Sequence, residues 1–320
     1  MKVLGGLRGA AMENTQNTDS PPETTFVQVA GRWAFDKTRA DYQGRDEKSH
    51  YPNGVCLVPT RFRSGTLSVR ATLGIESAAR LVIGYEASTP TYYSVGIGGY
   101  GFAYVIDEFS GQGWRSLAST GASSQIKSGP QDLEASVSGQ RISLSIDGIC
   151  VLKHVLPSPL QGEQVGLFAW GDKNVTFDNF RVRANKPRIF VVMQFGEPYD
   201  FLYQDVILPV VQKLGFEALR ADDVYRPGVI LQDIIREIIE CDVVVADITP
   251  VNANVFYELG YAHATQKPTI LLANRSVEKL PFDVSGYRVV YYSNTIRGKS
   301  EIMSVLEKHL QSIRSGGTAS

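Results

Sequence analysis

The chain is poor in cysteine, has no long hydrophobic run and carries no excess charge of either sign, and each absence removes a class of protein. Its three cysteines, Cys56, Cys150 and Cys241, lie far apart, so their spacing predicts neither a zinc site nor a disulfide framework. We expect free, buried thiols instead. No apolar run approaches the roughly 20 residues of a membrane span, and the glycine-rich start is a poor secretory signal. The sequence therefore predicts a cytoplasmic protein with no membrane partner.

The balance of charge argues against nucleic acid as a partner. Lys and Arg total 32, Asp and Glu total 33, and the formal net charge is −1. Proteins that bind the phosphate backbone depend on a surplus of basic side chains, which this chain lacks. At 43% hydrophobic and 20% charged residues the composition is that of a globular protein. Its 320 residues suggest two domains.

The N-terminal part reads as a leader followed by an all-β domain. Residues 1–25 end in a polar, proline-containing stretch and are predicted to be a disordered leader. Over residues 26–184, short runs rich in Val, Ile, Tyr, Phe and Thr alternate with Gly, Ser, Asn and Pro. In Arg141–Ile146 apolar and polar residues alternate strictly, and Asp147-Gly148 then signals a tight hairpin turn. This series predicts a β-sandwich of the jelly-roll type.

Two features of this all-β region invite a ligand-binding interpretation. The run from Gly96 to Gly101 matches the GxGxxG pattern of dinucleotide-binding sites, but no helix follows it, so the structural context of such a site is missing. Trp33, Trp114 and Trp170 would stack on a sugar if they were exposed. We expect them in the core, because large aromatic side chains are usually buried there.

From Pro187 the pattern changes to strands that alternate with helices, and residues 187–315 are predicted to form an α/β domain before a short tail at 316–320. Such alternation indicates a parallel sheet with right-handed crossovers. Five strands suggest the flavodoxin-like order 2-1-3-4-5. The helix expected over Tyr199–Leu214 contains Pro209, which must kink it or mark its first turn. The other expected elements are strands at Arg188–Met193, Phe216–Arg220, Asp242–Ala246, Thr269–Ala273 and Tyr287–Tyr292, and helices at Val229–Glu240, Asn254–Thr265 and Lys299–Ile313.

Polar residues follow the first three of these strands, where a doubly wound sheet places its ligands. They are Gln194-Phe195-Gly196-Glu197, Arg220-Ala221-Asp222-Asp223 and Asp247-Ile248-Thr249. The Arg226-Pro227-Gly228 segment is either a turn before a helix or a mobile flap over the site.

The segment after the third strand, from Asp247 to His263, is the most informative. Asn252 is a natural N-cap, and helical spacing then places Asn254 and Glu258 on one face, close to Asp247. We expect the helix dipole to keep Glu258 ionised. An ionised carboxylate can act as a nucleophile or stabilise an oxocarbenium ion during glycosidic cleavage. Gly260 is expected to allow a close approach of neighbouring backbone.

Each of these residues also has a structural interpretation that the sequence leaves open. Asp247 would then cap the turn that follows it, Asn254 would be a second capping residue, and Glu258 would be a solvated helix carboxylate.

The DxTxxNxNVxYELGxAHA pattern from Asp247 to Ala264, together with Phe190–Phe195 and Arg220-Ala221-Asp222, resembles the Toll/interleukin-receptor-like and nucleoside 2-deoxyribosyltransferase-like domains of bacteria. Members of this group cleave N-glycosidic bonds with a helix glutamate. The resemblance implies that Glu258 is catalytic.

The same resemblance implies substrate-binding roles for five further residues, namely Asp247 and Asn254 at the ribose or base, Asp222 and Phe195 in the base pocket, and Tyr257. The transferases carry a second acidic residue shortly before their glutamate, where this chain has Asn252 and Asn254. That departure favours hydrolysis of NAD over base exchange.

The all-β region ends in Gln164–Trp170 and Val175–Val182, which resemble laminin-G/concanavalin-like sandwiches. This likeness implies a sugar or protein ligand on the sandwich. For the whole chain we expect an NAD glycohydrolase effector of bacterial antiphage defence, controlled by ligand binding or assembly through the sandwich and homo-oligomeric when active. NAD or a related nucleotide is the substrate, and neither a cofactor nor a metal is expected. A deoxyribosyltransferase and a non-catalytic nucleotide-binding or scaffolding module are the alternatives.

Overall fold

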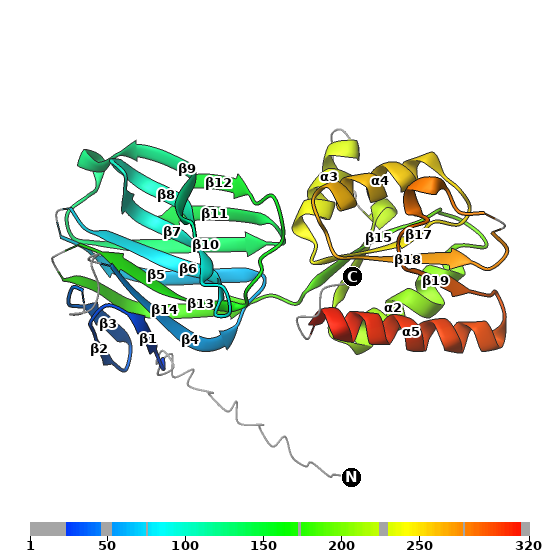
Figure 1. Cartoon of the computed structure of the whole chain (residues 1–320), viewed down its shortest axis with the longest axis horizontal. Helices are drawn as coiled ribbons and strands as arrows, with labels where there is room; N and C mark the ends of the chain where they lie inside the picture. The colour runs from blue at the N-terminus through cyan, green and yellow to red at the C-terminus, as the bar shows by residue number, and fades with distance from the viewer. Residues whose placement is uncertain are drawn as a thin grey trace, which may run out of the picture.

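The structure is a computed structural model that describes residues 24–45, 53–74, 76–171, 174–223, 230–277 and 279–314. The predicted tail, the Arg226-Pro227-Gly228 segment and nearly all of the predicted leader lie outside these ranges. A β-sandwich and an α/β domain lie side by side and are joined by the chain between strands β14 (Val175–Ala184) and β15 (Arg188–Val192) (Figure 1). Within the described ranges, every helix is too short or too polar to cross a membrane.

The N-terminal domain consists of two seven-stranded antiparallel sheets. The order in the first sheet is β1 (Val27–Ala30), β4 (Asn53–Arg61), β13 (Gln164–Trp170), β6 (Ala78–Glu86), β7 (Thr91–Gly99), β8 (Phe102–Ser110) and β9 (Gly113–Ala122). The order in the second sheet is β12 (Ile149–Val155), β11 (Arg141–Ile146), β10 (Pro130–Ser138), β5 (Gly65–Thr72), β14, β3 (Arg39–Tyr42) and β2 (Trp33–Asp36). The predicted sandwich is confirmed.

Alternation along the strands builds the core of the sandwich, because successive side chains point to opposite faces of a sheet. In β11, Ile142, Leu144 and Ile146 are buried between the sheets, and the residues between them are half-buried. Asp147 and Gly148 then adopt φ values of 50° and 79°, which a two-residue hairpin turn requires. The hairpin predicted at this point is therefore confirmed.

Two residues that the sequence placed in the core of the sandwich are exposed. Trp33 is buried as expected, but Trp170 is 43% exposed, because it ends β13 and its side chain points away from the space between the sheets. All three cysteines are free, and Cys150 is exposed on β12, an edge strand that packs only part of its surface on the core. The expectation of burial was wrong for these two residues.

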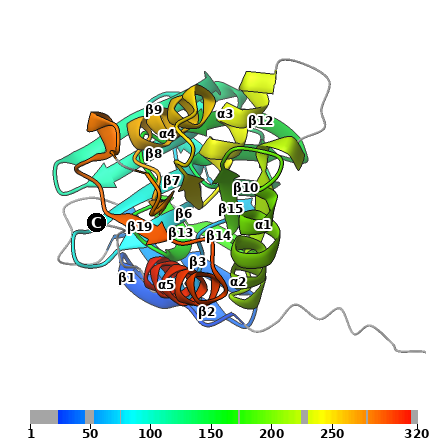
Figure 2. The same cartoon turned by 90° about the vertical axis from the view of Figure 1, so that its right-hand side faces the viewer.

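The C-terminal domain contains a five-stranded parallel sheet in the predicted order. The strands run β16 (Glu217–Arg220), β15, β17 (Val243–Asp247), β18 (Thr269–Asn274) and β19 (Val289–Tyr292). One face is covered by α1 (Asp200–Leu202), the π-helical turn η2 (Tyr203–Ile207), α2 (Leu208–Lys213) and α5 (Ile296–Arg314). The other face is covered by α3 (Ile230–Glu240) and α4 (Ala253–Ala264), which lie next to each other (Figure 2). Short 3-10 turns occupy Ala221–Asp223 and Phe282–Val284 in this domain and Ser123–Gln125 in the sandwich.

Pro209 shows how the sequence shapes the first helical crossover. It lies in the first turn of α2, and the turn just before it is π-helical rather than α-helical. A proline has no N–H to donate and its ring collides with the preceding turn of an α-helix, so the helix widens there. The result is three short helical pieces where the sequence predicted one interrupted helix.

Candidate functional site

The connections after β15 and β17 meet at the carboxyl edge of the sheet. These two strands are neighbours, and their connections leave on opposite faces, which is the point where open α/β sheets bind ligands. Asn252 bridges them, because its side-chain amide donates to Oε1 of Gln194, just beyond β15. Its Oδ1 also accepts from the backbone N of Asn254 at 2.8 Å, so the predicted N-cap of α4 is confirmed. The start of α4 is thereby fixed beside the end of β15.

Glu258 lies in the second turn of α4 and is buried, with 9% of its surface exposed. Burial raises the pKa of its carboxyl to about 7, and within the described ranges no hydrogen bond or ion pair opposes this. Burial therefore works against the helix dipole, which was expected to keep Glu258 ionised and which acts mainly on the first turn. The interpretation as a solvated helix carboxylate is wrong. A carboxyl near its midpoint at neutral pH exchanges protons readily, as acid–base and nucleophilic groups must.

The side chain of Glu258 lies on the flank of α4 that faces α3. His263, on the other flank, stacks on Tyr287 in the connection between β18 and β19, with 4.2 Å between ring centroids. Five residues correspond to about 140° around a helix, so Glu258 points away from that connection. Val255 and Leu259 fill the direction toward the sheet. The carboxyl therefore lies on the flank of α4 opposite His263, toward α3, which packs next to α4.

Asp247 is held by its own chain rather than open to a ligand. It is 1% exposed, and its two carboxylate oxygens accept from the backbone N of Thr249 at 3.2 Å and from the hydroxyl of Tyr292 at 2.9 Å. Burial raises its pKa to about 7, although both hydrogen bonds work in the opposite direction. Asp247 thus stabilises the turn after β17, as the structural interpretation expected. A contact with substrate stays a prediction.

Arg220, at the end of β16, gathers two of the predicted base-pocket residues. Its guanidinium donates from Nε to Asp222 Oδ1 at 2.6 Å and from Nη1 to Asp200 Oδ1 at 2.6 Å. The same group lies 5.4 Å from the ring centroid of Phe195 and 4.6 Å from that of Tyr203. Sequence reasoning noted the polar end of β16 but missed this organising role. An arginine two residues before a pair of aspartates, at the end of a strand, was the available signal.

The remaining predicted site residues lie at the surface of α4. Asn254 is exposed at its start, and Tyr257 is 55% exposed. Both side chains are therefore open to solvent, and α4 places Asn254 one turn before Glu258 on the same side of the helix, as expected. Gly260 is also exposed, and a Cβ added there would meet nothing within 4 Å, so the expected close approach of neighbouring backbone is absent. Among the described residues, no group of His, Cys, Asp and Glu side chains could hold a metal ion.

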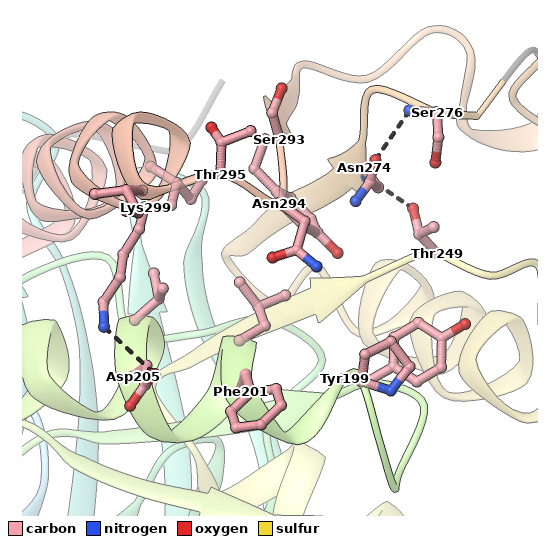
Figure 3. A pocket seen from close by; sticks show the side chains of 16 residues that line it. Tyr199, Phe201, Asp205, Thr249, Asn274, Ser276, Ser293, Asn294, Thr295 and Lys299 are labelled. Carbon is pink, nitrogen blue, oxygen red and sulfur yellow. Dashed lines mark hydrogen bonds and ion pairs between the residues drawn. The ribbon is translucent and has the colours of Figure 1, made fainter.

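A cavity of about 470 Å³ opens at the same edge of the sheet, but on the face that carries α1 and α5 (Figure 3). None of the predicted site residues lines it. Two of its lining residues, Thr249 and Tyr292, are the hydrogen-bond partners of Asp247. The buried carboxyl of Asp247 is therefore bound to the lining of this cavity without lining it itself.

The sandwich contacts α3 and α4, the helix that carries Glu258, through the hairpin between β10 and β11. Gln140, at its tip, is fully buried and donates from its backbone N to the carbonyl of Ile239 at 3.0 Å, at the end of α3. Its side-chain Nε2 donates to the carbonyl of Thr265 at 3.0 Å, directly after α4. One hairpin of the sandwich is thus bound to the C-terminal ends of both helices.

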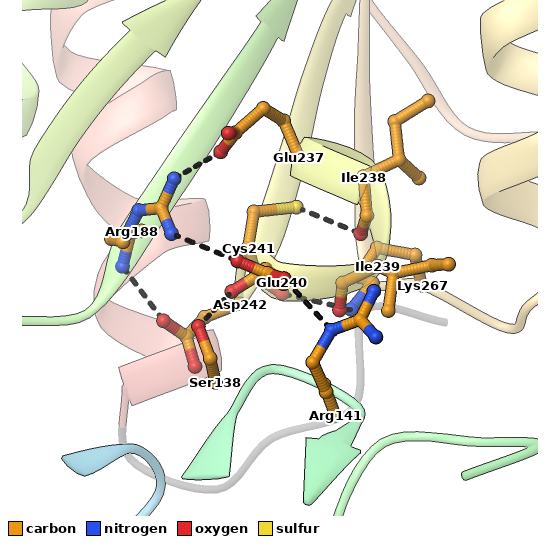
Figure 4. Close-up of polar contacts among 10 residues, drawn as sticks. All are labelled: Ser138, Arg141, Arg188, Glu237, Ile238, Ile239, Glu240, Cys241, Asp242 and Lys267. Atoms are coloured by element: carbon orange, nitrogen blue, oxygen red, sulfur yellow. Dashed lines mark hydrogen bonds and ion pairs between the residues drawn. The ribbon is translucent and has the colours of Figure 1, made fainter. Parts of the chain in front are cut away.

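Charged groups surround this contact (Figure 4). Arg141 donates from Nε to Glu240 Oε1 at 2.8 Å, which joins β11 to α3. Arg188, at the start of β15, binds Glu237 on the same helix. Lys267, 4% exposed, donates to the carbonyls of Ile239 at 3.0 Å and of Cys241 at 2.8 Å. A cation at the end of a helix complements its dipole, so the end of α3 is held from both domains.

No family model matches the chain, and no curated protein does. Among solved structures, a carbohydrate-binding module (CBM66) from Bacillus subtilis aligns with 49% of this chain and 94% of its own, at 17% identity and a TM-score of 0.42. The galectin LEC-6 of Caenorhabditis elegans covers 45% of this chain and 95% of its own, at 15% identity and a TM-score of 0.31. The CMP N-glycosidase BcmB of Clostridium botulinum covers 38% of this chain and 98% of its own, at 22% identity and a TM-score of 0.31. These likenesses say nothing of a ligand or a reaction of this chain.

Proposed function

We propose that the C-terminal domain cleaves the N-glycosidic bond of NAD and that Glu258 is its catalytic residue. The observation that carries this proposal is the buried Glu258 carboxyl, to which no described residue forms a hydrogen bond or an ion pair. A carboxyl without a partner is costly to bury. Such a cost is commonly found where a group serves a reaction rather than the fold.

The chemistry follows from what a carboxylate can do for a sugar ring. The bond between C1′ of the ribose and the pyridinium nitrogen breaks, and its electron pair goes to that nitrogen, which releases neutral nicotinamide. The ionised Glu258 carboxylate stabilises the positive charge that develops at C1′ or bonds to it directly. Water then adds to C1′ and loses a proton to the solvent; where Glu258 had bonded to C1′, that bond breaks and its electron pair returns to the carboxylate. Before cleavage, the positive charge of the nicotinamide ring favours the ionised form of Glu258.

Control of this reaction by the sandwich is supported by the contact at the β10–β11 hairpin. Gln140 touches the ends of α3 and α4, and Glu258 lies on the flank of α4 that faces α3. A shift of the hairpin, on ligand binding or on assembly of several copies, would therefore change the spacing of the two helices around the carboxyl. The ligand of the sandwich is a sugar or a protein in this proposal, and the active form is a homo-oligomer.

Nicotinamide release from NAD tests the proposal, measured by chromatography with the full chain over a range of protein concentrations. Release by the wild type is expected to fall by at least about a hundredfold in Glu258→Gln. Glu301→Gln, an exposed carboxylate on α5, is the matched control and should leave release unchanged. If wild type and Glu258→Gln are equally silent at every concentration, or equally active, the assignment fails.

Three further measurements separate the alternatives. Deoxynucleosides supplied with a second free base would be exchanged by a transferase and ignored by a hydrolase specific for NAD. NAD binding measured by calorimetry without turnover at any protein concentration would favour a non-catalytic module. A role in antiphage defence would appear as loss of cellular NAD after infection, in cells that carry the wild type but not Glu258→Gln.

A further inference from the structure

We propose that the cavity between α1 and α5 is a second binding site and that it takes a neutral nucleoside. It is separate from the proposed reaction, because Glu258 does not line it and it opens on the opposite face of the sheet from α4. Its volume of about 470 Å³ lies within the usual range of small-molecule sites. The size suits a base joined to one sugar rather than a dinucleotide.

One wall of the cavity is apolar and aromatic. Tyr199 and Phe201 stand at the beginning of α1, and Leu202, Val206 and Ile302 line the cavity beside them. Phe201 remains 57% exposed at this wall. A flat aromatic ligand would cover these rings and remove apolar surface from water, at about 25 cal/mol per Å². The wall therefore suits a planar ring.

The facing rim offers hydrogen bonds but no charge. Asn294 points its amide into the middle of the cavity (Figure 3), and Ser276 and Ser293 lie on the same rim. Among the described residues, none of these three side chains has a hydrogen-bond partner. Amide groups pair with the donor and acceptor edges of a base, and hydroxyls pair with those of a ribose. Both halves of a nucleoside thus find suitable groups.

The charges of the lining exclude a phosphorylated ligand. Only two lining residues are charged, Asp205 and Lys299, and they pair with each other at 3.3 Å. The cavity therefore carries no net charge to neutralise a phosphate, and Asp205 would repel one. The ligand of this cavity therefore differs from NAD and from nucleotides in that it carries no phosphate.

Calorimetry with adenosine and cytidine tests this inference on the full chain carrying Glu258→Gln, so that no glycosidic cleavage can consume the probe. We expect at least one nucleoside to bind, with AMP and free ribose at least tenfold weaker. Asn294→Leu should weaken the nucleoside at least tenfold. Asn185→Leu, an exposed asparagine outside the cavity, is the matched control and should leave binding unchanged.

Each other result would overturn the inference. Three outcomes would each exclude a neutral nucleoside in this cavity. They are no binding of either nucleoside, AMP that binds as tightly as adenosine, and nucleoside binding that survives Asn294→Leu. Because Asn294 is exposed, its substitution leaves the fold intact, which the thermal unfolding curve verifies. The outcome is independent of nicotinamide release, so this inference and the proposed function can fail separately.

Discussion

Gly139, in the hairpin between β10 and β11, lies directly against the carbonyl of Ile239 at the end of α3: a Cβ on this glycine would come within 2.4 Å of that oxygen. The carbonyl of Cys241 would be 2.7 Å away, and Gly139 has a φ of +54°. Only glycine combines this backbone conformation with such close contact. The two domains therefore meet at a position where no side chain fits.

We predict that Gly139→Ala loosens the contact between the domains. Gly148→Ala is the matched control, because Gly148 also has a positive φ in a neighbouring hairpin but nothing lies within 4 Å of its Cβ position. Both variants bear the strain of a left-handed residue, about 1 kcal/mol, and only Gly139→Ala adds the collision. Hydrogen exchange should accelerate at the ends of α3 and α4 in Gly139→Ala alone. Equal exchange in both variants would mean that the hairpin does not hold these helices.

Glu258→Gln is predicted to stabilise the protein at alkaline pH. The carboxyl has its pKa raised to about 7 from an ordinary value of 4.5, so between these values the native chain binds more protons than the unfolded chain. Its contribution to the free energy of unfolding therefore falls as pH rises from 4.5 to 7 and stays low above that. Replacing it should raise stability at pH 8 by up to about 3 kcal/mol, with little effect at pH 4.5. Urea unfolding at the two pH values measures this, and a variant less stable than wild type at pH 8 would show that the charge is paired.

Nicotinamide release is predicted to rise with pH and to level off above about pH 7. Only the ionised form of Glu258 stabilises the cation at C1′, and burial raises its pKa to about 7. Below that value kcat/KM should fall by about tenfold per pH unit, because it reports the free enzyme. A profile that is flat from pH 5 to 9 would rule out a carboxyl with this pKa as the reactive group.

Tyr292→Phe distinguishes Asp247 from Glu258, since both carboxyls have a pKa near 7. The tyrosine hydroxyl donates to Asp247 and favours its ionised form, so its removal should raise the pKa of Asp247 further. It should also cost about 1–3 kcal/mol of stability above pH 7, where Asp247 would keep an unpaired buried oxygen. The pH profile of nicotinamide release should stay in place. A profile displaced upward would instead assign the titration to Asp247.

The sequence determined the elements of this protein because their patterns are local. Alternation in Arg141–Ile146 places one side of the strand in the core, and continuous apolar runs marked parallel strands, whose number suggested the order 2-1-3-4-5. Asn252 was recognisable as an N-cap because its partner, the backbone N of Asn254, is two residues away. The reactive candidate Glu258 was found from its place in the motif after β17.

Only the tertiary structure decided the electrostatic state of the site and its connection to the sandwich. Burial by surrounding segments raises the pKa of Glu258, whereas the local argument from the helix dipole predicts a lower pKa. Arg220 joins Asp200, 20 residues away, and Gln140 reaches Ile239 and Thr265, across separations that no periodicity records. The cavity beside α5 is likewise assembled from α1, η2, α5 and the connections that follow β15, β17, β18 and β19, with the last residues of β18 and β19. Contacts of this kind arise from packing, which a single sequence read along its length does not contain.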